Sequence, residues 1–506
     1  MSEILATYDA ERGRLAYYHD SYEGGSRYRA PSSTTIGTAS LTRYRDRLDS
    51  EGRRTGDHDE VVTERYRSYL VPHPGETKAA FEVRLSLAAY VNVIAPIVDA
   101  YADAVAGPVT RDLGMLEQYL RRLDGDAQTW AEMVEEVSRW AVVYGMCAVV
   151  LDAPAANPAA NRADEERLGV GLRASVVVPT AWAWVSVGDD GVDEFAYVDQ
   201  AYTAESVGAV SQSATLWRYT RTTWERHRVT VSLSEAGAFG KVRGSLGAET
   251  VIESGKLANP GRVPVAFAYF RRTSSRAPEG VSLVADACDL ARQVYNTLSW
   301  VEEIHRKTAF PFLAIPERAA GGQLDPATKI QVGPSTALGF SSETGAPSWV
   351  QPSAESTREL RDHAVFLVAL ALRTTGLEVT ADQSAPTQSG VALKIRSRDF
   401  DARCVKFAKS MGAFERAALE IAGRILGLDP AQASITYPRR FVLPDSAEDL
   451  ARCVVLLQTF RDELGPEGFA ATVRQALDAA LALNDTELAR LVDEVRERVA
   501  AKGEAA

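Results

Sequence analysis

The sequence predicts a helix-rich α+β protein, and two patterns lead to that expectation. Between residues 170 and 272 the chain is rich in β-branched and aromatic residues, with Gly, Pro and Asp between the runs, which is typical of strands. Two later segments, 281–306 and 390–426, repeat apolar residues every three or four positions, which indicates amphipathic helices. Strands and helices therefore fall in separate stretches of the chain.

The composition is ordinary for a folded protein and excludes some functions. The 506 residues, 46% of them hydrophobic and 25% charged, are enough for about three domain-sized units with a sizeable core. A net charge of −12 argues against a sequence-independent DNA binder, which would need excess Lys and Arg. The longest apolar run, 140–151, is too short to span a bilayer, and "MSEILATYDAERGR" lacks a signal-peptide core. We therefore expect a soluble protein made inside the cell.

In the first half of the chain, residues 1–62 are expected to form an exposed arm, because 20–62 are rich in Ser, Gly, Arg and Asp. Thr77 can cap the following helix, and Pro96 should break or kink it. Another helix is expected over 126–146, followed by the β-rich part of five to seven strands. We expect four of its tryptophans to be core or sheet-face residues: Trp182, Trp184, Trp217 and Trp224.

Beyond residue 280 the pattern is mostly helical. The helix over 281–306 would be roughly 39 Å long. Residues 308–353 form a compact insertion, with short strand signals in "FPFLAIP" and "SWVQP". A second helix over 355–376 is apolar on nearly all sides from Ala364 to Leu372, so we expect that stretch to be buried on every face, and Gly376 ends the helix.

A polar loop then leads to the longest helix. Ser389 is its expected N-cap, and Gly427 and Pro430 end it. Over 390–426 it would be roughly 55 Å long. A period of 3.5 fits a bundle helix or a coiled coil, and periodicity does not choose between them. The residues that carry the period are Phe400, Cys404, Phe407, Met411, Phe414, Ala418, Ile421 and Ile425. A strand over 434–443 and three helices over 446–464, 467–482 and 485–502 complete the chain.

The sequence offers no motif for catalysis. "GAFGKV" lacks the spacing of a phosphate-binding loop, and neither H-E-x-x-H nor G-x-S-x-G occurs. The six histidines and four cysteines are scattered, so we expect no metal site, no disulfide framework and no cofactor, with the cysteines acting as small buried residues. Acidic residues interrupt one basic cluster, which favours a solvated helix face: Lys394, Arg396, Arg398, Arg403, Lys406 and Lys409.

The order of these elements, and three local motifs, resemble the portal proteins of tailed bacteriophages. The motifs are "YLVPHPGE…R…AAYVN" (69–92), "NPGRVPVAFAYF" (259–270) and "APTQSGVALKIRSRDFDAR" (385–403). The resemblance covers the chain from about residue 65 to its end. Each motif alone is weakly specific, and their order and spacing make the case.

The resemblance implies a division of the chain into named parts. The arm over 1–62 has no counterpart in the family. The remaining parts are a wing (63–278), stem helix 1 (279–307), a clip (308–353), stem helix 2 (354–377), a tunnel loop (378–389), a long helix (390–428), a wing return strand (429–445) and a helical crown (446–506).

The resemblance also implies a structural protein without catalysis. The family forms a ring, a homododecamer, at one capsid vertex of the virion, is assembled in the host cytoplasm, and conducts double-stranded DNA during packaging and ejection. The implied partners are further copies of the chain, the terminase large subunit, head-completion or adaptor proteins, and the major capsid and scaffold proteins, with no membrane. Two alternatives remain open: another head–tail ring protein, and an enzyme whose site is assembled from distant residues.

Three sets of residues follow from that implied architecture. The expected tunnel loop holds no Lys or Arg, so it would not grip the phosphates of a passing duplex; its candidates are Glu378, Asp382, Gln383, Ser384, Thr387 and Gln388. The expected stem and ring packing residues are Val284, Ala291, Val294, Leu298, Leu360, Leu367, Phe400, Phe407, Met411 and Phe414. The expected partner-binding residues of the clip are Glu317, Arg318, Gln323, Asp325 and Lys329.

Overall fold

The chain divides into two compact units, Met1–Arg439 (unit 1) and Arg440–Ala506 (unit 2). The computed structural model describes residues 2–29, 31, 36–48, 54–73, 76–107, 109–123, 127–153, 171–203, 211–232, 246–257, 260–273, 278–308, 312–314, 348–350, 355–377, 390–438, 441, 473 and 492–493. Almost all of unit 2, and with it the three helices expected after residue 446, lies outside the described residues.

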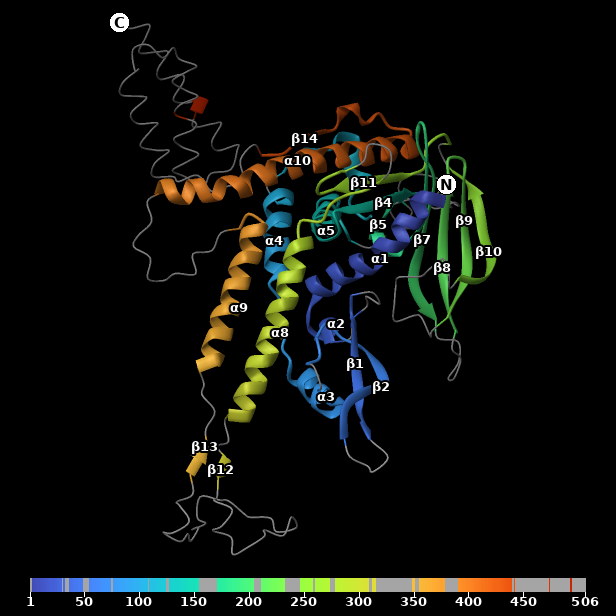
Figure 1. Cartoon of the computed structure of the whole chain (residues 1–506). Coiled ribbons are helices and arrows are strands. Elements are labelled where there is room, and N and C mark those ends of the chain that lie inside the picture. The colour runs from blue at the N-terminus through green and yellow to red at the C-terminus, as the bar shows by residue number, and fades with distance from the viewer. Residues whose placement is uncertain are drawn as a thin grey trace, which may run out of the picture. The chain divides into compact units, whose positions relative to one another are not determined.

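Eight α-helices belong to the described part of unit 1 (Figure 1). They are α1 (Ser2–Glu23), α2 (Gly25–Arg29), α3 (Lys78–Leu87), α4 (Ile94–Ala106), α5 (Trp130–Tyr144), α8 (Ala285–Thr308), α9 (Glu355–Thr374) and α10 (Gly390–Leu426). Among the described residues, none of these helices combines the length and apolarity that a bilayer crossing requires.

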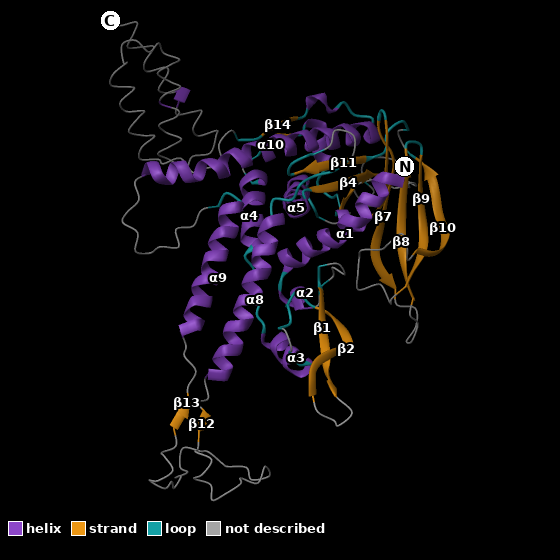
Figure 2. Cartoon of the chain, in the orientation of Figure 1, coloured by secondary structure: helices purple, strands orange, loops and turns teal. Residues whose placement is uncertain are grey.

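The strands of unit 1 form two larger sheets and three strand pairs (Figure 2). The five-stranded sheet has the order β10 (Leu246–Lys256), β9 (Thr223–Ser232), β8 (Ser211–Thr220), β7 (Gly191–Thr203), β6 (Trp182–Gly188). The three-stranded sheet has the order β11 (Val265–Tyr269), β4 (Met146–Asp152), β5 (Arg173–Val177). The pairs are β1 (Thr38–Leu48) with β2 (Arg54–Arg67), β12 (Phe312–Ala314) with β13 (Ser348–Val350), and β3 (Thr110–Asp112) with β14 (Ser434–Thr436).

The two larger sheets pack face to face over one apolar core. Alternate residues of β4 point into it, because successive side chains of a strand face opposite sides of the sheet. Trp182 is 1% exposed and lies edge-on to Phe195 and Phe267, with ring centroids 5.6 and 5.4 Å away. Trp224 is also buried, and Trp184 and Trp217 are half-buried on the sheet faces, so the expectation for the four tryptophans is confirmed.

Helices cover the other face of the three-stranded sheet. α5 packs on β4, and α10 packs on β11, where Phe407 lies 5.1 Å from Phe270 between ring centroids. α5 starts with a capping box between Thr129 and Glu132 and ends at Gly145, whose φ is +85°. A side chain at Gly145 would meet the backbone of Val281 and Ser282 at 2.5 Å, so glycine is required by a close approach as well as by its φ.

Several expected boundaries agree with the structure. α10 spans Gly390–Leu426 and ends at Gly427, whose φ is +67°, and Gly376 follows α9 with φ +84°. Pro96 lies in the first turn of α4 rather than at a kink, because a proline there removes no intrahelical hydrogen bond. The helix expected from Thr77 accordingly ends at Leu87, and Asn92 accepts hydrogen bonds from the backbone N–H groups of Ile94 and Ala95 to start α4.

The expectation of an exposed, weakly structured arm over residues 1–62 is wrong. Helix α1 covers Ser2–Glu23, and Leu15, Ala16, Tyr17 and Tyr18 within it are at most 5% exposed. The polar composition concealed this because the buried face of α1 is built from tyrosines and small residues rather than from a conspicuous aliphatic stripe.

Candidate functional site: the α8–α9 pair and its polar joint

The helices α8 and α9 run in opposite directions, side by side, and carry the β12–β13 pair beyond their far ends (Figure 1). His305 near the end of α8 meets Arg361 near the start of α9, with 3.2 Å between Nε2 and Nη2. The buried face of α9 is built from small or slim residues at helical spacing: Thr357, Ala364, Leu367 and Ala371. Small side chains let packed helix backbones approach closely.

The residues expected to pack between subunits are mostly core residues of a single chain. Leu298, Leu360 and Phe400 are half-buried, and the other seven are 4% exposed or less: Val284, Ala291, Val294, Leu367, Phe407, Met411 and Phe414. The 3.5 period of α10 thus serves packing against β11, β4 and α4 within the chain. Burial therefore leaves these seven little surface to offer a neighbour.

The expectation that α9 is buried on every face is also wrong for the single chain. Val365 is 56% exposed and Phe366 is 60% exposed. Both lie on the side of α9 opposite to Ala364, Leu367 and Ala371, because residues one or two positions apart in a helix point in different directions. A surface that the sequence pattern marks as apolar is left uncovered here.

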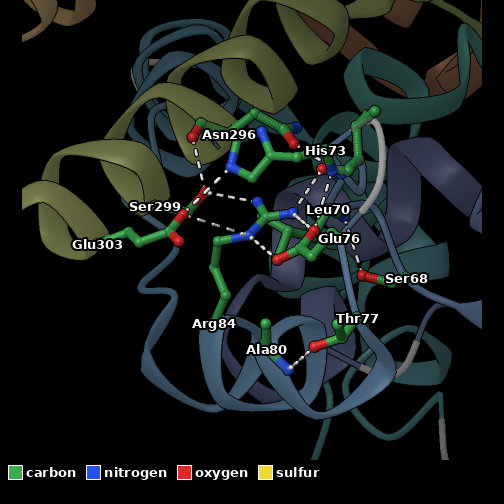
Figure 3. A network of polar contacts seen from close by, with 11 residues as sticks. Ser68, Leu70, His73, Glu76, Thr77, Ala80, Arg84, Asn296, Ser299 and Glu303 are labelled. Carbon is green, nitrogen blue, oxygen red and sulfur yellow. Dashed lines mark hydrogen bonds and ion pairs between the residues drawn. The ribbon is translucent and has the colours of Figure 1, made fainter. Parts of the chain in front are cut away.

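A network of buried polar groups joins α3 and the segment before it to α8 (Figure 3). We call this network the polar joint and define it by Glu76, Arg84, Asn296, Ser299 and Glu303. Arg84 binds Glu76 with two parallel hydrogen bonds, Nε to Oε1 at 2.9 Å and Nη2 to Oε2 at 2.6 Å. The side chains are 3% and 4% exposed, so this charge pair is almost fully removed from water.

The remaining donors of Arg84 hold the pair against α8. Nη1 donates to the Ser299 hydroxyl at 3.2 Å, and Nη2 donates to the carbonyl of Val71 at 2.8 Å. Glu303 lies 3.9 Å from Nε and 3.1 Å from the His73 ring. Since guanidinium has a planar set of five N–H donors, one arginine fixes α3, Val71 and α8 together.

Electrostatics of the joint favour an ionised Glu76. Burial alone would raise the pKa of Glu76, but the hydrogen bonds from Arg84 and from the backbone N–H of His73 outweigh it and lower that pKa below the ordinary 4.5. Asn296 completes the joint from α8: its Oδ1 accepts from the N–H of Val71 at 2.7 Å, and its Nδ2 donates to the carbonyl of Tyr69 at 3.2 Å. Backbone groups of an extended segment are thus satisfied by a helix side chain.

A cluster of tyrosines lies next to the polar joint and anchors α1 and α2. The rings of Tyr28 and Tyr90 stack with centroids 3.8 Å apart, and Tyr28 lies 4.5 Å from Tyr69 and 5.1 Å from Tyr295. Burial is the largest cause of the raised pKa of the Tyr28, Tyr90 and Tyr295 hydroxyls, so these three stay neutral at physiological pH. Tyr17 of α1 adds a hydrogen bond to the carbonyl of Cys288 at 2.6 Å.

Sequence reasoning found the motif but not its role. The sequence shows the motif "YLVPHPGE…R…AAYVN" but not what its residues contact. In the structure its tyrosines belong to the aromatic cluster, and its Glu and Arg belong to the polar joint. A usable signal was the opposite-charge pair Glu76 and Arg84 on either side of a helix start. The partners Asn296 and Ser299 gave none, since polar residues on a helix usually face water.

The tunnel-loop and clip candidates are not among the residues that the structure describes. Residues 378–389 and all five clip candidates between 317 and 329 lie outside the described residues. Within the described ranges, no group of three or more His, Cys, Asp and Glu side chains is arranged to hold a metal ion. Cys147, Cys288 and Cys404 are free and buried, and desolvation raises the pKa of each thiol, which makes them poor nucleophiles.

Neither protein-family models nor curated proteins give a match to this chain. Solved structures do, and three of them are described as "Virion of native gene transfer agent (GTA) particle", "Neck of native GTA particle computed with C12 symmetry" and "Neck of empty GTA particle computed with C6 symmetry". Their matching chains are 16%, 15% and 16% identical, with TM-scores of 0.39, 0.38 and 0.36. The alignments cover 79–80% of this chain and 89–90% of those chains.

Proposed function

We propose that this chain is the subunit of a portal ring, which occupies one capsid vertex of a phage-like virion and conducts double-stranded DNA during packaging and ejection. The observation that supports the proposal is the order of elements in unit 1. A part bearing two sheets leads into α8, a short strand pair, α9 and then the 37-residue α10. The portal resemblance implies this order for wing, stem, clip, second stem helix and long helix.

The α8–α9 pair suits the role of a stem. The second half of α8 is fixed to the wing by the polar joint and the tyrosine cluster, and the insertion follows the end of that half. A docking site on such a support keeps a fixed distance from the wing. We propose that the insertion binds the terminase large subunit during packaging and head-completion or adaptor proteins afterwards, through Glu317, Arg318, Gln323, Asp325 and Lys329.

The segment between α9 and α10 is proposed to line the narrowest part of the channel. B-DNA carries one negative charge per roughly 1.7 Å of its axis. Residues 378–389 contain no Lys or Arg and include Glu378 and Asp382, so a ring of such segments would not bind the phosphates. The duplex would then pass without sequence readout and without a strong electrostatic trap.

The first experiment is to measure the mass of the purified chain by light scattering and to image the same fraction in negative stain. We expect a particle of about a dozen subunits with a central hole. A compact dimer without a hole would contradict the proposal and redirect attention to an enzyme site.

A second experiment tests the channel segment. Asp382→Lys combined with Gln383→Lys places new positive charge around the duplex in every subunit, so we expect DNA packaging and ejection to slow by at least tenfold, as the extra phosphate contacts must be broken at each step. The control is Asp189→Lys with Asp190→Lys in the exposed turn between β6 and β7, which adds comparable charge away from the channel. Unchanged rates in both directions for the first variant would refute the assignment.

A further inference from the structure

The three-stranded sheet has an open edge along β5, which among the described strands pairs with β4 alone. In the register of these two strands Leu151 lies opposite Ala174. The N–H of Leu151 donates to the carbonyl of Pro264 at 2.9 Å. The N–H of Ala174 donates to the carbonyl of Leu123, also at 2.9 Å, so Leu151 and Ala174 form a non-bonded pair. Because bonded and non-bonded pairs alternate along an antiparallel ladder, Val176 also turns its N–H and its carbonyl away from β4.

This open edge lines a groove of about 480 Å³, a volume within the range of ligand-binding clefts. Val176 is half-buried there, and neither its N–H nor its carbonyl has a hydrogen-bond partner among the described residues. Val198 and Asp199, which follow the last register pair of β7 with β6, also line the groove. An edge strand with unpaired backbone groups is a template for pairing with another chain.

Helices α1 and α5 supply an aromatic wall of the groove. The rings of His19 and Trp140 stack with centroids 5.4 Å apart. The Tyr144 hydroxyl lies 2.7 Å from Nδ1 of His19 and helps to fix that ring. Burial lowers the pKa of His19, so the ring is neutral at physiological pH and adds no positive charge to the groove. Aromatic faces of this kind pack against the stem of a Lys or Arg side chain and attract its charge.

The charged residues that line the groove are mostly acidic: Glu23, Arg27, Glu136 and Asp199. Arg27 lies 3.3 Å from Glu23, so this cation already has a partner. Glu136 accepts a hydrogen bond from the neutral amide of Gln128 at 3.0 Å. Within the described ranges, neither Glu136 nor Asp199 forms a salt bridge. Two carboxylates therefore lack a counter-charge, which favours a cationic ligand and disfavours a nucleic acid.

We infer that this groove binds an extended segment of a partner protein that carries a Lys or Arg side chain. The segment adds to β5 as a further strand and takes up the N–H and the carbonyl of Val176 in backbone hydrogen bonds. Since side chains alternate between the two faces of a strand, every second side chain of the segment faces the groove carboxylates. The backbone contacts supply affinity, and the carboxylates select a basic sequence. Such a site does not require the ring proposed above.

Titration calorimetry with peptides tests the class of ligand on the full-length chain. The probe is the peptide STVRVTS, and the control is STVEVTS, which differs only in the sign of its central charge. We expect the arginine peptide to bind about tenfold more tightly, because only its charge complements the groove. Equal affinities would overturn the cationic ligand, and the absence of binding by either peptide at millimolar concentration would overturn the site.

A proline at position 176 tests the strand pairing. Val176→Pro removes the N–H that faces the groove and leaves the ladder to β4 intact, and edge strands accept proline at such positions. We expect this variant to bind STVRVTS about tenfold more weakly, because a backbone hydrogen bond is lost and the ring obstructs the edge. Val176→Ala is the matched control, since it keeps the N–H and should bind like the parent. Parent affinity in a proline variant with unchanged circular dichroism would overturn the pairing.

N-methylated peptides test the same hydrogen bonds without changing the protein. One version of STVRVTS is methylated at the backbone nitrogens of both valines, and the other at the nitrogen of the arginine. The N–H groups of alternate residues point to the same edge of a strand, so at least one version should lose about tenfold in affinity. Unchanged affinity of both versions would show that the groove does not bind the peptide backbone.

Neutral variants of the groove test the charge selection. Glu136→Gln combined with Asp199→Asn should reduce the preference for STVRVTS over STVEVTS from about tenfold to nearly none. Asp190→Asn is the control, because it removes one charge from the exposed turn between β6 and β7, outside the groove. An unchanged preference in the double variant would overturn the role assigned to the two carboxylates.

A second copy of this chain is the alternative occupant of the groove. Light scattering separates the two cases, because Val176→Pro would then dissociate oligomers of the parent chain. Dissociation would overturn the assignment to a partner protein. An unchanged mass, together with weaker binding of STVRVTS, supports that assignment.

Discussion

Two buried arginine–glutamate pairs among the described residues of unit 1 join the same side-chain types over very different distances along the sequence. Arg84 and Glu76 are eight residues apart and fix a short helix to α8. Arg111 and Glu415 are 304 residues apart, and Glu415 is 0% exposed on α10. We call the first the local pair, because it fixes the position of one helix. We call the second the long-range pair, because it joins parts of unit 1 that are far apart in the sequence.

Three different side chains donate hydrogen bonds to Glu415 of the long-range pair. The carboxylate of Glu415 accepts from Arg111 Nε at 2.8 Å, from Arg111 Nη2 at 3.1 Å, from Trp130 Nε1 at 2.7 Å and from the Tyr437 hydroxyl. One side chain of α10 thus holds β3, the start of α5 and the segment after β14. Burial raises the pKa of Tyr437 first and the neighbouring carboxylate raises it further, so Tyr437 remains a donor at neutral pH.

The largest expected effect comes from removing the Glu415 carboxylate of the long-range pair. Glu415→Ala leaves an arginine, an indole N–H and a hydroxyl buried without an acceptor, so we expect the free energy of unfolding to fall by about 3–5 kcal/mol. Urea titration followed by tryptophan fluorescence measures the change. Glu415→Gln is the matched control and should lose less, because its amide oxygen still accepts one of these hydrogen bonds. Losses below about 1 kcal/mol for the alanine variant would contradict the role assigned to Glu415.

A smaller and more local effect is expected from the other pair. Arg84→Met leaves Glu76 buried and unpaired, and we expect a loss of about 3 kcal/mol together with faster amide hydrogen exchange in α3. Combining Arg84→Met with Glu76→Gln removes both charges, so the double variant should be more stable than Arg84→Met alone. The exposed Arg121–Glu117 pair gives the reference, since Arg121→Ala should change stability by less than about 1 kcal/mol. An additive loss in the double variant would show that the two charges are not coupled.

The smallest expected effect is a pH dependence from the same pair. The native pKa of Glu76 lies below the ordinary 4.5, so the unfolded chain binds this proton more tightly than the native protein does. Its contribution to stability is therefore complete above pH 4.5 and is lost as the pH falls through the native pKa. Glu76→Gln should flatten the decline in unfolding midpoint below pH 4.5 while changing little of its slope above that value. An equal slope for both proteins would show that Glu76 does not titrate differently in the two states.

The same contrast between local and long-range contacts explains what the sequence could predict. The ends of α10 and α9 follow from a periodic run bounded by glycine, and Gly427 and Gly376 both have positive φ. The β12–β13 pair and the tryptophan core follow from β-branched and aromatic runs. Each of these signals is contained within a few neighbouring residues.

Contacts between distant residues could not be predicted in this way. The buried face of α1 depends on Tyr17 reaching a carbonyl 271 residues away, and Tyr69 donates to Asp20 across 49 residues. The periodic apolar stripe of α10 is mostly buried within the chain, but periodicity alone does not tell whether the covering surface belongs to the same chain or to another. The exposure of Val365 and Phe366 on α9 also needed the structure, because exposure depends on which neighbours cover each side chain.

The β12–β13 pair has a consequence for how such a protein can change over evolutionary time. Three register pairs, Phe312 with Val350, Leu313 with Trp349 and Ala314 with Ser348, hold the two ends of the intervening segment together. Lengthening or replacing that segment changes neither the spacing of those ends nor the packing of α8 on α9, and loop closure entropy rises only slowly with length. The sequence between the two strands can therefore change in length while the helix pair beside it stays the same.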